Sequence, residues 1–238
     1  MNIPSNPREG VNWLKRAAEN ATPDVPQALF ILVLYYAVII SNPQNQGQLY
    51  ENPDESVSGT ILKDEAYALE LYTKGALLGY APAQHKLGTC FEYGSLGCEV
   101  DPRRSIAWFS RAAEQGDPEA ELALSGWYLT GAEGILPQSD TEAFLWGQKA
   151  AEKGNAKAEF ALGYYFETGI GMPPNLVEAK RWYLRAAEQG QKRAMARLAE
   201  LKRSPNGGPG MGSSGGRKEL QKQRRGGGGA GKEDCVVM

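Results

Sequence analysis

The sequence predicts an all-α fold, a right-handed α-solenoid of helical-hairpin repeats with a disordered C-terminal tail. The first observation is a six-residue pattern, a basic residue followed by Ala-Ala-Glu, a polar residue and Gly, at Arg111–Gly116, Lys149–Gly154 and Arg185–Gly190. With a degenerate copy at Lys74–Gly79, these segments place their glycines 37, 38 and 36 residues apart. Periods of this length are typical of stacked helical hairpins. Two further observations are the alternation of two helical patterns within each period and a change of composition after residue 203.

The first helix of each period carries an apolar stripe with the spacing i, i+4, i+8. This spacing keeps the side chains on one face of a helix and does not suit a strand, whose faces alternate at every residue. Small residues follow each central leucine, at Gly88, Ser125 and Gly163, and they predict close approach of a neighbouring helix. The stripe consists of Ala83, Leu87 and Phe91, of Ala120, Leu124 and Tyr128, and of Ala158, Leu162 and Phe166.

The second helix combines two small residues with a tryptophan at the spacing i, i+3, i+7. We expect each indole to fill the groove between neighbouring hairpins, where its burial contributes roughly 1.5–3 kcal/mol or more. The small residues beside it let adjacent hairpins interdigitate. The positions are Ser105, Trp108 and Ala112, then Ala143, Trp146 and Ala150, then Ala179, Trp182 and Ala186.

The ends of the second helices are also marked in the sequence. Left-handed C-caps favour glycine because it has no Cβ, and glycines stand just after the last turn at Gly116, Gly154 and Gly190. Short polar residues are expected as N-caps or loop residues before these helices, at Asp101, Asp140 and Asn175.

These patterns divide the chain into an N-terminal segment at 1–9, a repeat solenoid at 10–203 and a tail at 204–238. The most apolar run, Ala28–Ile40, is shorter than the roughly 20 residues of a membrane-spanning helix. We therefore interpret it as a buried solenoid helix, with a hydrophobic anchor as the alternative. The predicted repeats are approximately 10–40, 61–80, 81–117, 118–155 and 156–191, followed by a cap helix at 192–202.

Composition and charge narrow the function. The formal charge of −2 argues against nucleic-acid binding, which usually needs a concentrated basic face. Cys90, Cys98 and Cys235 have unrelated spacings, so they form neither a disulfide framework nor a metal-ligand set and fit a reducing compartment. The N-terminus has neither the basic nor the apolar region of a signal peptide.

No catalytic constellation is visible, so we predict a protein that is not an enzyme and uses no cofactor or metal. His85 is the only histidine, and nothing near it in sequence supplies an orienting triad. Carboxylates recur at the end of every second helix, which is typical of scaffold residues, whereas a catalytic acid occurs once. These residues are Glu114, Glu152 and Glu188.

The tail ends in a lipidation signal. Cys235 is followed by Val236, Val237 and the terminal Met238, an arrangement that resembles a farnesylation motif. We expect farnesyltransferase to attach a covalent farnesyl lipid to Cys235, with later removal of the last three residues. The alternative is an accidental apolar terminus.

Basic residues in the tail provide a second membrane signal, which matters because one lipid chain binds membranes only marginally. From residue 202 onward, eight basic residues face three acidic ones. The alternative is that these charges only keep a linker soluble or bind nucleic acid weakly. We predict the cytoplasmic face of a membrane (plasma membrane, septum or bud-neck-like site), with the cytosol before prenylation. The main electrostatic contacts would be Arg217, Lys218, Lys222, Arg224 and Arg225.

A second stripe on the first helix changes from repeat to repeat. Because stacking positions stay similar in every repeat, this variation suggests a partner groove on the concave face. The alternative is that Leu122 and Phe160 form a second packing row. The stripe contains His85, Thr89 and Glu92, then Leu122, Gly126 and Leu129, then Phe160, Tyr164 and Glu167.

The repeated motifs, Ala-(x)3-Leu-Gly-(x)2-Phe/Tyr and Ala-(x)2-Trp-Tyr/Phe-(x)2-Ala-Ala-Glu-Gln-Gly, resemble the Sel1-like repeat over roughly Gly10–Lys202. More narrowly, Glu92–Cys98, Ala120–Gly131 and Glu178–Tyr183, with the basic tail and terminal CaaX box, resemble the fungal chitin synthase activators. Members of that family bind and localise a chitin synthase catalytic subunit during cell-wall and septum formation.

The resemblance implies a non-catalytic adaptor that activates or positions a chitin synthase. The alternative is a generic Sel1-repeat adaptor in signalling or membrane-protein quality control. An enzyme is the third hypothesis, because some bacterial Sel1-repeat proteins have been linked to hydrolysis. Those proteins carry a cysteine pair in each repeat, and Cys90 and Cys98 do not recur here.

Overall fold

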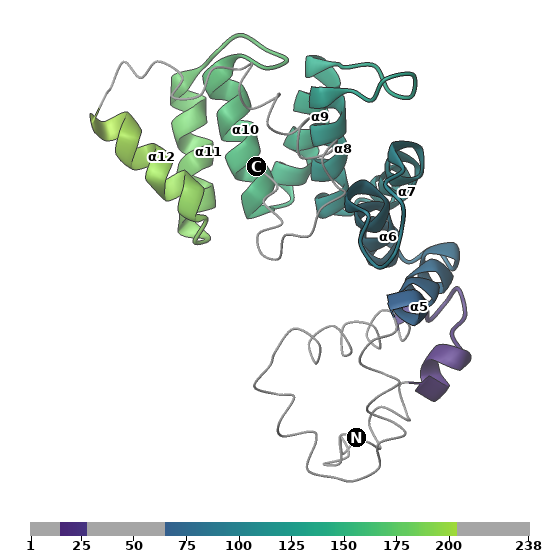
Figure 1. The fold of residues 1–238 in the computed structure, drawn as a ribbon. Helices are drawn as coiled ribbons and strands as arrows, with labels where there is room; N and C mark the ends of the chain where they lie inside the picture. The colour runs from purple at the N-terminus through teal and green to yellow at the C-terminus, as the bar shows by residue number, and fades with distance from the viewer. Residues whose placement is uncertain (1–14, 28–64, 204–238) are drawn as a thin grey trace, which may run out of the picture.

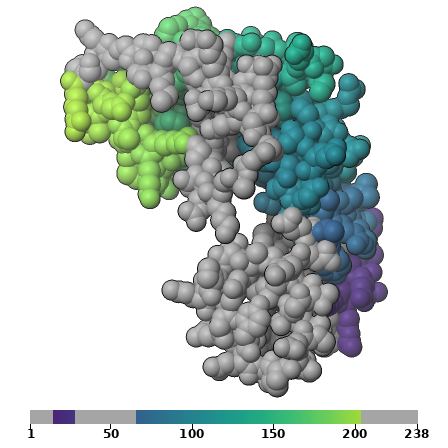
Figure 2. Space-filling model, viewed as in Figure 1, coloured from purple at the N-terminus to yellow at the C-terminus, as the bar shows by residue number. Residues whose placement is uncertain are grey.

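The structure, a computed structural model, describes residues 15–27 and 65–203, and these residues form helices joined by short turns. The helices follow one another in a curved row from α5 to α12 (Figure 1). In space-filling view the described residues follow the same bend, from the blue part at the lower right to the yellow-green α12 at the upper left (Figure 2). The predicted all-α solenoid is therefore confirmed for this part of the chain. The helices are α5 (Glu65–Leu77), α6 (Ala81–Tyr93), α7 (Pro102–Glu114), α8 (Pro118–Thr130), α9 (Asp140–Glu152), α10 (Ala156–Thr168), α11 (Leu176–Glu188) and α12 (Lys192–Arg203).

Three hairpins, α6–α7, α8–α9 and α10–α11, form the centre of the row. The alanines and leucines of the predicted apolar stripe are at most 2% exposed in all three first helices, while the aromatic third members are half-buried. Each first helix also packs against the second helix of the hairpin before it. The stripe thus holds both the hairpin and the stack together.

Local residues set the ends of these helices as expected, with one correction. The side chains of Asp101 and Asn175 accept hydrogen bonds from the first backbone N–H groups of α7 and α11. At α9 the N-cap is Ser139, and Asp140 is the first helical residue, so Asp140 is not a cap. The closing glycines of α7, α9 and α11 have φ between +81° and +84°, the left-handed region that disfavours a Cβ.

The small residues of the first helices lie where a second helix comes close. A Cβ at Gly88 would stand 2.8 Å from the ring of Phe109, and one at Gly163 would stand 2.6 Å from the ring of Tyr183. Ser125 occupies this position in the middle hairpin, and the facing residue there is the small Gly147.

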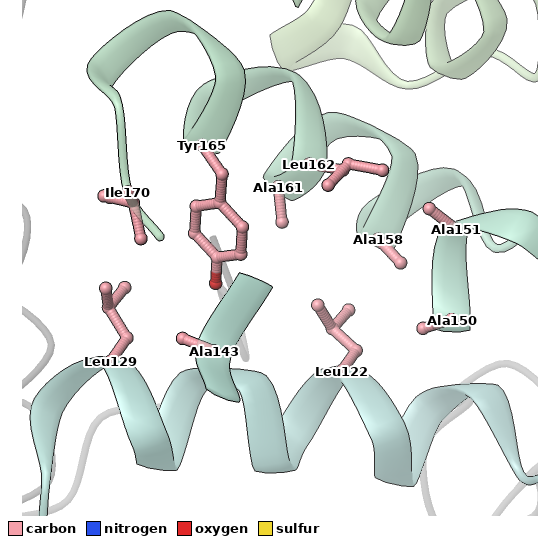
Figure 3. Packing of buried hydrophobic residues seen from close by; sticks show 10 residues of the cluster. All are labelled: Leu122, Leu129, Ala143, Ala150, Ala151, Ala158, Ala161, Leu162, Tyr165 and Ile170. Atoms are coloured by element: carbon pink, nitrogen blue, oxygen red, sulfur yellow. The ribbon is translucent and has the colours of Figure 1, made fainter. Parts of the chain in front are cut away.

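Tyr165 of the next hairpin fills the space beside Gly147. Figure 3 shows its ring reaching from α10 toward Ala143 of α9. Its hydroxyl lies 2.8 Å from the Ser125 hydroxyl, which donates a hydrogen bond to the Ala143 carbonyl at 2.6 Å. A residue from one repeat therefore completes the packing of the repeat before it.

The repeated tryptophans pack between hairpins as expected, although part of each indole stays exposed. Trp108, Trp146 and Trp182 are only half-buried. The cations of Arg111, Lys149 and Arg185 cover their rings at 4.0–4.6 Å from the ring centroid. The fully buried aromatic is the following residue, Phe109 in α7 and Tyr183 in α11, because that position points directly into its own hairpin.

Several predictions concern residues outside the described ranges. They include the N-terminal segment at 1–9, the helix at Ala28–Ile40, and the tail at 204–238 with its lipidation and basic residues. Within residues 15–27 and 65–203, no helix has the length and hydropathy to cross a membrane.

Candidate protein-interaction surface

The first helices, α6, α8 and α10, form the candidate surface. Helices α8 and α10 contact each other directly, although α9 lies between them in the chain. This contact brings the first helices of two neighbouring hairpins together. Partly or fully exposed residues lie along one face of these helices, and this face includes His85, Thr89, Gly126, Phe160 and Tyr164 of the predicted partner stripe.

The structure separates the predicted stripe into two groups. His85, Thr89, Phe160 and Tyr164 are half-buried, so part of each side chain reaches the surface. Their positions on α6 and α10 fit a contact surface. The Thr89 hydroxyl donates to the His85 carbonyl at 3.0 Å and so fixes its own orientation.

Leu122 and Leu129 belong to the core instead. They are 4% and 2% exposed and pack with Ala143, Leu162 and Tyr165. Figure 3 shows both leucines pointing from α8 into this cluster. They are a second packing row, so they do not offer a partner contact. The alternative interpretation holds for Leu122, and Phe160 also packs inward, with its ring centroid 5.5 Å from that of Tyr183, while part of its side chain stays exposed.

The two glutamates of the predicted stripe are also internal. Glu92 is buried, and the Glu167 side chain is only 4% exposed. Glu167 accepts hydrogen bonds from the Tyr183 hydroxyl at 2.8 Å and from Arg197 Nε at 3.1 Å, and it pairs with a second nitrogen of Arg197. Its carboxylate therefore links α10, α11 and α12, and its hydrogen bonds are made inside the fold.

We define the inner stripe as the solvent-facing residues of the first helices. On α8 two of these residues, Ala123 and Gly126, are small, and they lie between larger side chains on α6 and α10. Lys86, Glu119 and Lys157 were not predicted, although charged residues at one helical register were the signal that could have found them. The inner stripe consists of His85, Lys86 and Thr89, of Glu119, Ala123 and Gly126, and of Lys157, Phe160 and Tyr164.

Charges on the inner stripe pair across neighbouring helices. Lys157 Nζ lies 3.2 Å from a Glu119 carboxylate oxygen, and Asn155 donates to the same carboxylate at 2.9 Å. Burial lowers the pKa of His85, an effect that Asp117 and Glu119 oppose and that Lys86 and Lys157 reinforce. His85 is therefore neutral at pH 7, with its ring 5.6 Å from that of Phe109.

A separate set of buried polar residues holds the repeats in register. Gln84, Glu121 and Glu159 follow the buried alanines of α6, α8 and α10 and are at most 5% exposed. Gln84 donates to the Ala76 carbonyl at 3.0 Å and accepts from Gln115 at 2.7 Å. Because similar contacts recur at each hairpin, these groups are part of the scaffold.

The corresponding contact in the middle hairpin joins two repeats. Lys153 Nζ donates to Glu121 at 2.6 Å and to the Gly116 carbonyl at 2.9 Å. In the last hairpin, Glu159 pairs with Arg185 at 3.0 Å and accepts from Gln189 at 2.7 Å. Burial raises the pKa of the Glu159 carboxyl, and Arg185 partly offsets this effect.

The described residues offer little for catalysis. They contain no cluster of His, Cys, Asp and Glu that would hold a metal ion. A depression of about 730 Å³ beside the α8–α9 loop, Gly131–Gln138, has Glu133 as the only ionisable residue in its lining, so it lacks a carboxylate pair. Burial raises the pKa of the Cys90 thiol, which disfavours the nucleophilic thiolate.

The fold and this surface define an α-solenoid repeat protein of the kind that presents broad surfaces to protein partners. The family model described as Sel1 repeat matches residues 1–21, 47–80, 81–117, 118–155 and 156–191. The chain therefore belongs to the Sel1 repeat family. The first two matches begin at other residues than the predicted units at 10–40 and 61–80.

Curated relatives include two fungal proteins named for chitin synthase. Chitin synthase regulator SKT5 of Malassezia restricta is 47% identical over 194 residues, which cover 82% of this chain and 12% of the relative. Chitin synthase regulatory factor 3 of Schizosaccharomyces pombe is 43% identical over 192 residues, covering 80% of this chain and 19% of the relative. The chain thus spans less than a fifth of either protein.

A further curated relative is not named for chitin synthase. Activator of C kinase protein 1 of Saccharomyces cerevisiae is 39% identical over 198 residues, which cover 80% of this chain and 30% of the relative. Among solved structures, a protective antigen of uropathogenic Escherichia coli with an SLR fold has a TM-score of 0.63 and 27% identity. That match covers 92% of this chain and 41% of the antigen.

Proposed function

We propose that the chain is a non-catalytic adaptor that binds a chitin synthase catalytic subunit and positions or activates it at a membrane. The observation that carries this proposal is the identity of 43–47%, over four fifths of the chain, with proteins named chitin synthase regulators. Because the chain spans a small part of those proteins, the partner and the activation are proposed for this chain.

The inner stripe is the surface on which such a partner would dock. Its half-buried aromatic residues, Phe160 and Tyr164, suit an interface because large rigid side chains provide much contact area. The exposed Lys86 adds charge, and the small residues of α8 leave room for partner side chains. The proposed contact area therefore runs across α6, α8 and α10.

A double substitution on the inner stripe tests the adaptor role. Lys86→Glu with Phe160→Asp reverses one exposed charge and places a carboxylate in the proposed contact area. We expect co-purification of the chitin synthase catalytic subunit to fall at least about tenfold, the size of a lost hot spot. Leu184→Asp is the matched control, because Leu184 is exposed on the second helix α11. Equal recovery with both variants would exclude the inner stripe.

We further propose that Cys235 carries a farnesyl lipid, added by farnesyltransferase. The sequence support is the terminal Cys-Val-Val-Met. Basic residues of the tail would also be attracted to an anionic membrane leaflet, namely Arg217, Lys218, Lys222, Arg224 and Arg225. Attachment would hold the adaptor at the cytoplasmic face of the plasma membrane, a septum or a bud-neck-like site. It would also raise the local concentration of adaptor near an embedded partner. Before prenylation the protein would be cytosolic.

Substitution of Cys235 tests this attachment. We expect Cys235→Ser to abolish incorporation of an isoprenoid label and to move the protein from the membrane fraction to the soluble fraction. Cys98→Ser is the control, because Cys98 is a partly exposed cysteine at an unrelated position. Absence of label in the wild-type protein would refute farnesylation while leaving the adaptor proposal intact.

A second candidate is a signalling adaptor, which the similarity to Activator of C kinase protein 1 favours. Crosslinking at the inner stripe in cells distinguishes the two. We expect a crosslinker at position 160 to capture the chitin synthase subunit. Capture of a kinase-pathway protein in its place would support the signalling role.

A further inference from the structure

The C-terminal end of the described solenoid is an incomplete hairpin. Helix α12 is the last helix of the row (Figure 1) and packs on α11. Ala194 of α12 aligns with Ala158 of α10, since each is the third residue of its helix and each is fully buried. By this alignment α12 is the first helix of another hairpin, and the described residues contain no second helix to accompany it.

Helix α12 is more exposed than the equivalent first helices. The central leucines of α6, α8 and α10 are at most 2% exposed, whereas the equivalent Leu198 is only half-buried. Met195 is 46% exposed, although its equivalents, Gln84, Glu121 and Glu159, are at most 5% exposed. We define the end face as the exposed residues Met195, Ala196, Ala199, Lys202 and Arg203 together with Leu198.

Contacts in the last complete hairpin show how a helix would lie on the end face. Glu159, early in α10, contacts Arg185 and Gln189 late in α11. Gly163, in the middle of α10, faces Ala179 and Tyr183. The covering helix is therefore antiparallel, and on α12 its N-terminus would lie beside Lys202 and Arg203.

The size of the residue that faces Ala199 follows from the complete hairpins. Gly88 and Gly163 face aromatic rings, and a Cβ at either position would come within 2.8 Å of the ring. Ser125 has a Cβ, and it faces Gly147. Ala199 also has a Cβ, so a covering helix must place a small residue against it.

Charge gives the second requirement. The exposed Lys202 and Arg203 at the end of α12 favour acidic residues in the first turn of an antiparallel helix, where the helix dipole also favours them. Among the second helices of this chain, α9 has both features, with Asp140 and Glu142 in its first turn and Gly147 at the facing position.

Neither the tail nor a second copy meets these requirements. Before Cys235, residues 204–238 contain Met211 and Leu220 as their only large apolar residues, and they carry a surplus of basic charge like the end face itself. In a second copy, the second helices are already packed in their own hairpins, as the buried Ala143 and Ala150 of α9 show.

We propose that the end face binds an amphipathic helix of a partner protein, which completes the hairpin in trans. That helix has an acidic first turn and a glycine, alanine or serine facing Ala199. This binding site lies apart from the inner stripe, and it does not depend on the proposed chitin synthase role.

A synthetic peptide with the α9 sequence, Ser139–Gly154, is the probe. A lactam bridge on its outward side keeps it helical, since isolated helices of this length are marginal in water. Fluorescence anisotropy with the full-length chain measures binding. We expect saturable binding by the native-sequence peptide and at least about tenfold weaker binding by the matched Gly147→Tyr peptide, because the added ring collides with Ala199. Raising the salt concentration weakens binding as the charges are screened.

Substitutions in the chain show where the peptide binds. Met195→Glu is expected to weaken binding about tenfold, while Leu184→Glu, which changes a similarly exposed residue of α11, leaves it unchanged. Both residues are on the surface, so circular dichroism should give the same melting temperature as for wild type.

Three outcomes would overturn the proposal. The first is no saturable binding of the native-sequence peptide. The second is equal binding of the two peptides, or an unchanged affinity in Met195→Glu. The third is light scattering that shows a dimer of the chain which Met195→Glu dissociates, because a second copy would then be the occupant.

Discussion

At the scale of single residues, the inner stripe contains one group whose protonation state depends on its surroundings. His85 packs near the Phe109 ring. The acidic Asp117 and Glu119 raise its pKa, and the basic Lys86 and Lys157 lower it. Burial is the largest effect and lowers its pKa. The sequence located His85 on a first helix, but apart from the adjacent Lys86 the groups that act on it come from residues more than 20 positions away.

This shift predicts a pH-dependent stability. In the unfolded chain His85 binds a proton near pH 6.5, whereas the folded state resists protonation until lower pH. The stability from neutral His85 is therefore complete above pH 6.5, and it is lost as the pH falls through the folded pKa. His85→Gln should reduce this loss, measured as the difference in free energy of unfolding between pH 7.5 and pH 5. An identical pH dependence in both proteins would contradict the assignment.

At the scale of helices, α12 is attached through a polar network as well as through its apolar side. Ala194 and Leu201 are buried against α11, and Arg197 reaches back to Glu167 of α10. The hydrogen bonding of Arg197 to the accepting Glu167 carboxylate is the main reason that the pKa of Arg197 is raised. Loss of this carboxylate should therefore loosen α12 more than any other helix.

Glu167→Gln removes the charge and keeps the size of the side chain. We expect the local free energy of opening of α12 to fall by about 1.5–3 kcal/mol, as for a lost hydrogen bond to a charged group. Hydrogen exchange of the α12 amides measures it. Glu178→Gln, which removes an exposed pair with Arg181 on α11, should change little. Equal effects of the two substitutions would show that the network adds no stability.

Periodic residues made the helices predictable, because a buried stripe and a left-handed glycine depend mainly on local spacing. Side chains that meet across repeats were harder to place. Glu167 had the expected helical position, but its partner Arg197 lies 30 residues away. The cations over the indoles, by contrast, come from three residues farther along the same helix, as Arg185 does for Trp182. The predicted partner stripe therefore mixes buried and surface residues, since Leu122 and Leu129 differ from Phe160 and Tyr164 in burial and not in pattern.

At the scale of the whole molecule, buried polar contacts couple neighbouring repeats. The Gly116 carbonyl ends one hairpin and accepts a hydrogen bond from Lys153, which ends the next hairpin. The same ammonium group neutralises the buried Glu121. Repeat proteins have mostly contacts between neighbours, so these links largely decide how cooperatively the array unfolds.

Lys153→Met should weaken this coupling. It leaves the buried Glu121 without its cation, so we expect a cost of roughly 1–3 kcal/mol and a broader thermal transition. Circular dichroism and hydrogen exchange of α7 and α9 would measure both. Lys149→Met is the control, because Lys149 is exposed and covers one face of Trp146. A sharp transition unchanged from wild type would show that the repeats are coupled by their apolar contacts alone.

The repeats of this solenoid are not equivalent, because a small residue, Gly147, in one repeat is matched by a large one, Tyr165, in the next. The phenol of one unit occupies the room that the glycine of the preceding unit leaves free. Excising residues 118–155 would bring that phenol next to the unit that already holds Phe109 against Gly88. Two rings would then compete for one space, so we expect removal of the middle unit to destabilise the solenoid, although its period suggests interchangeable units.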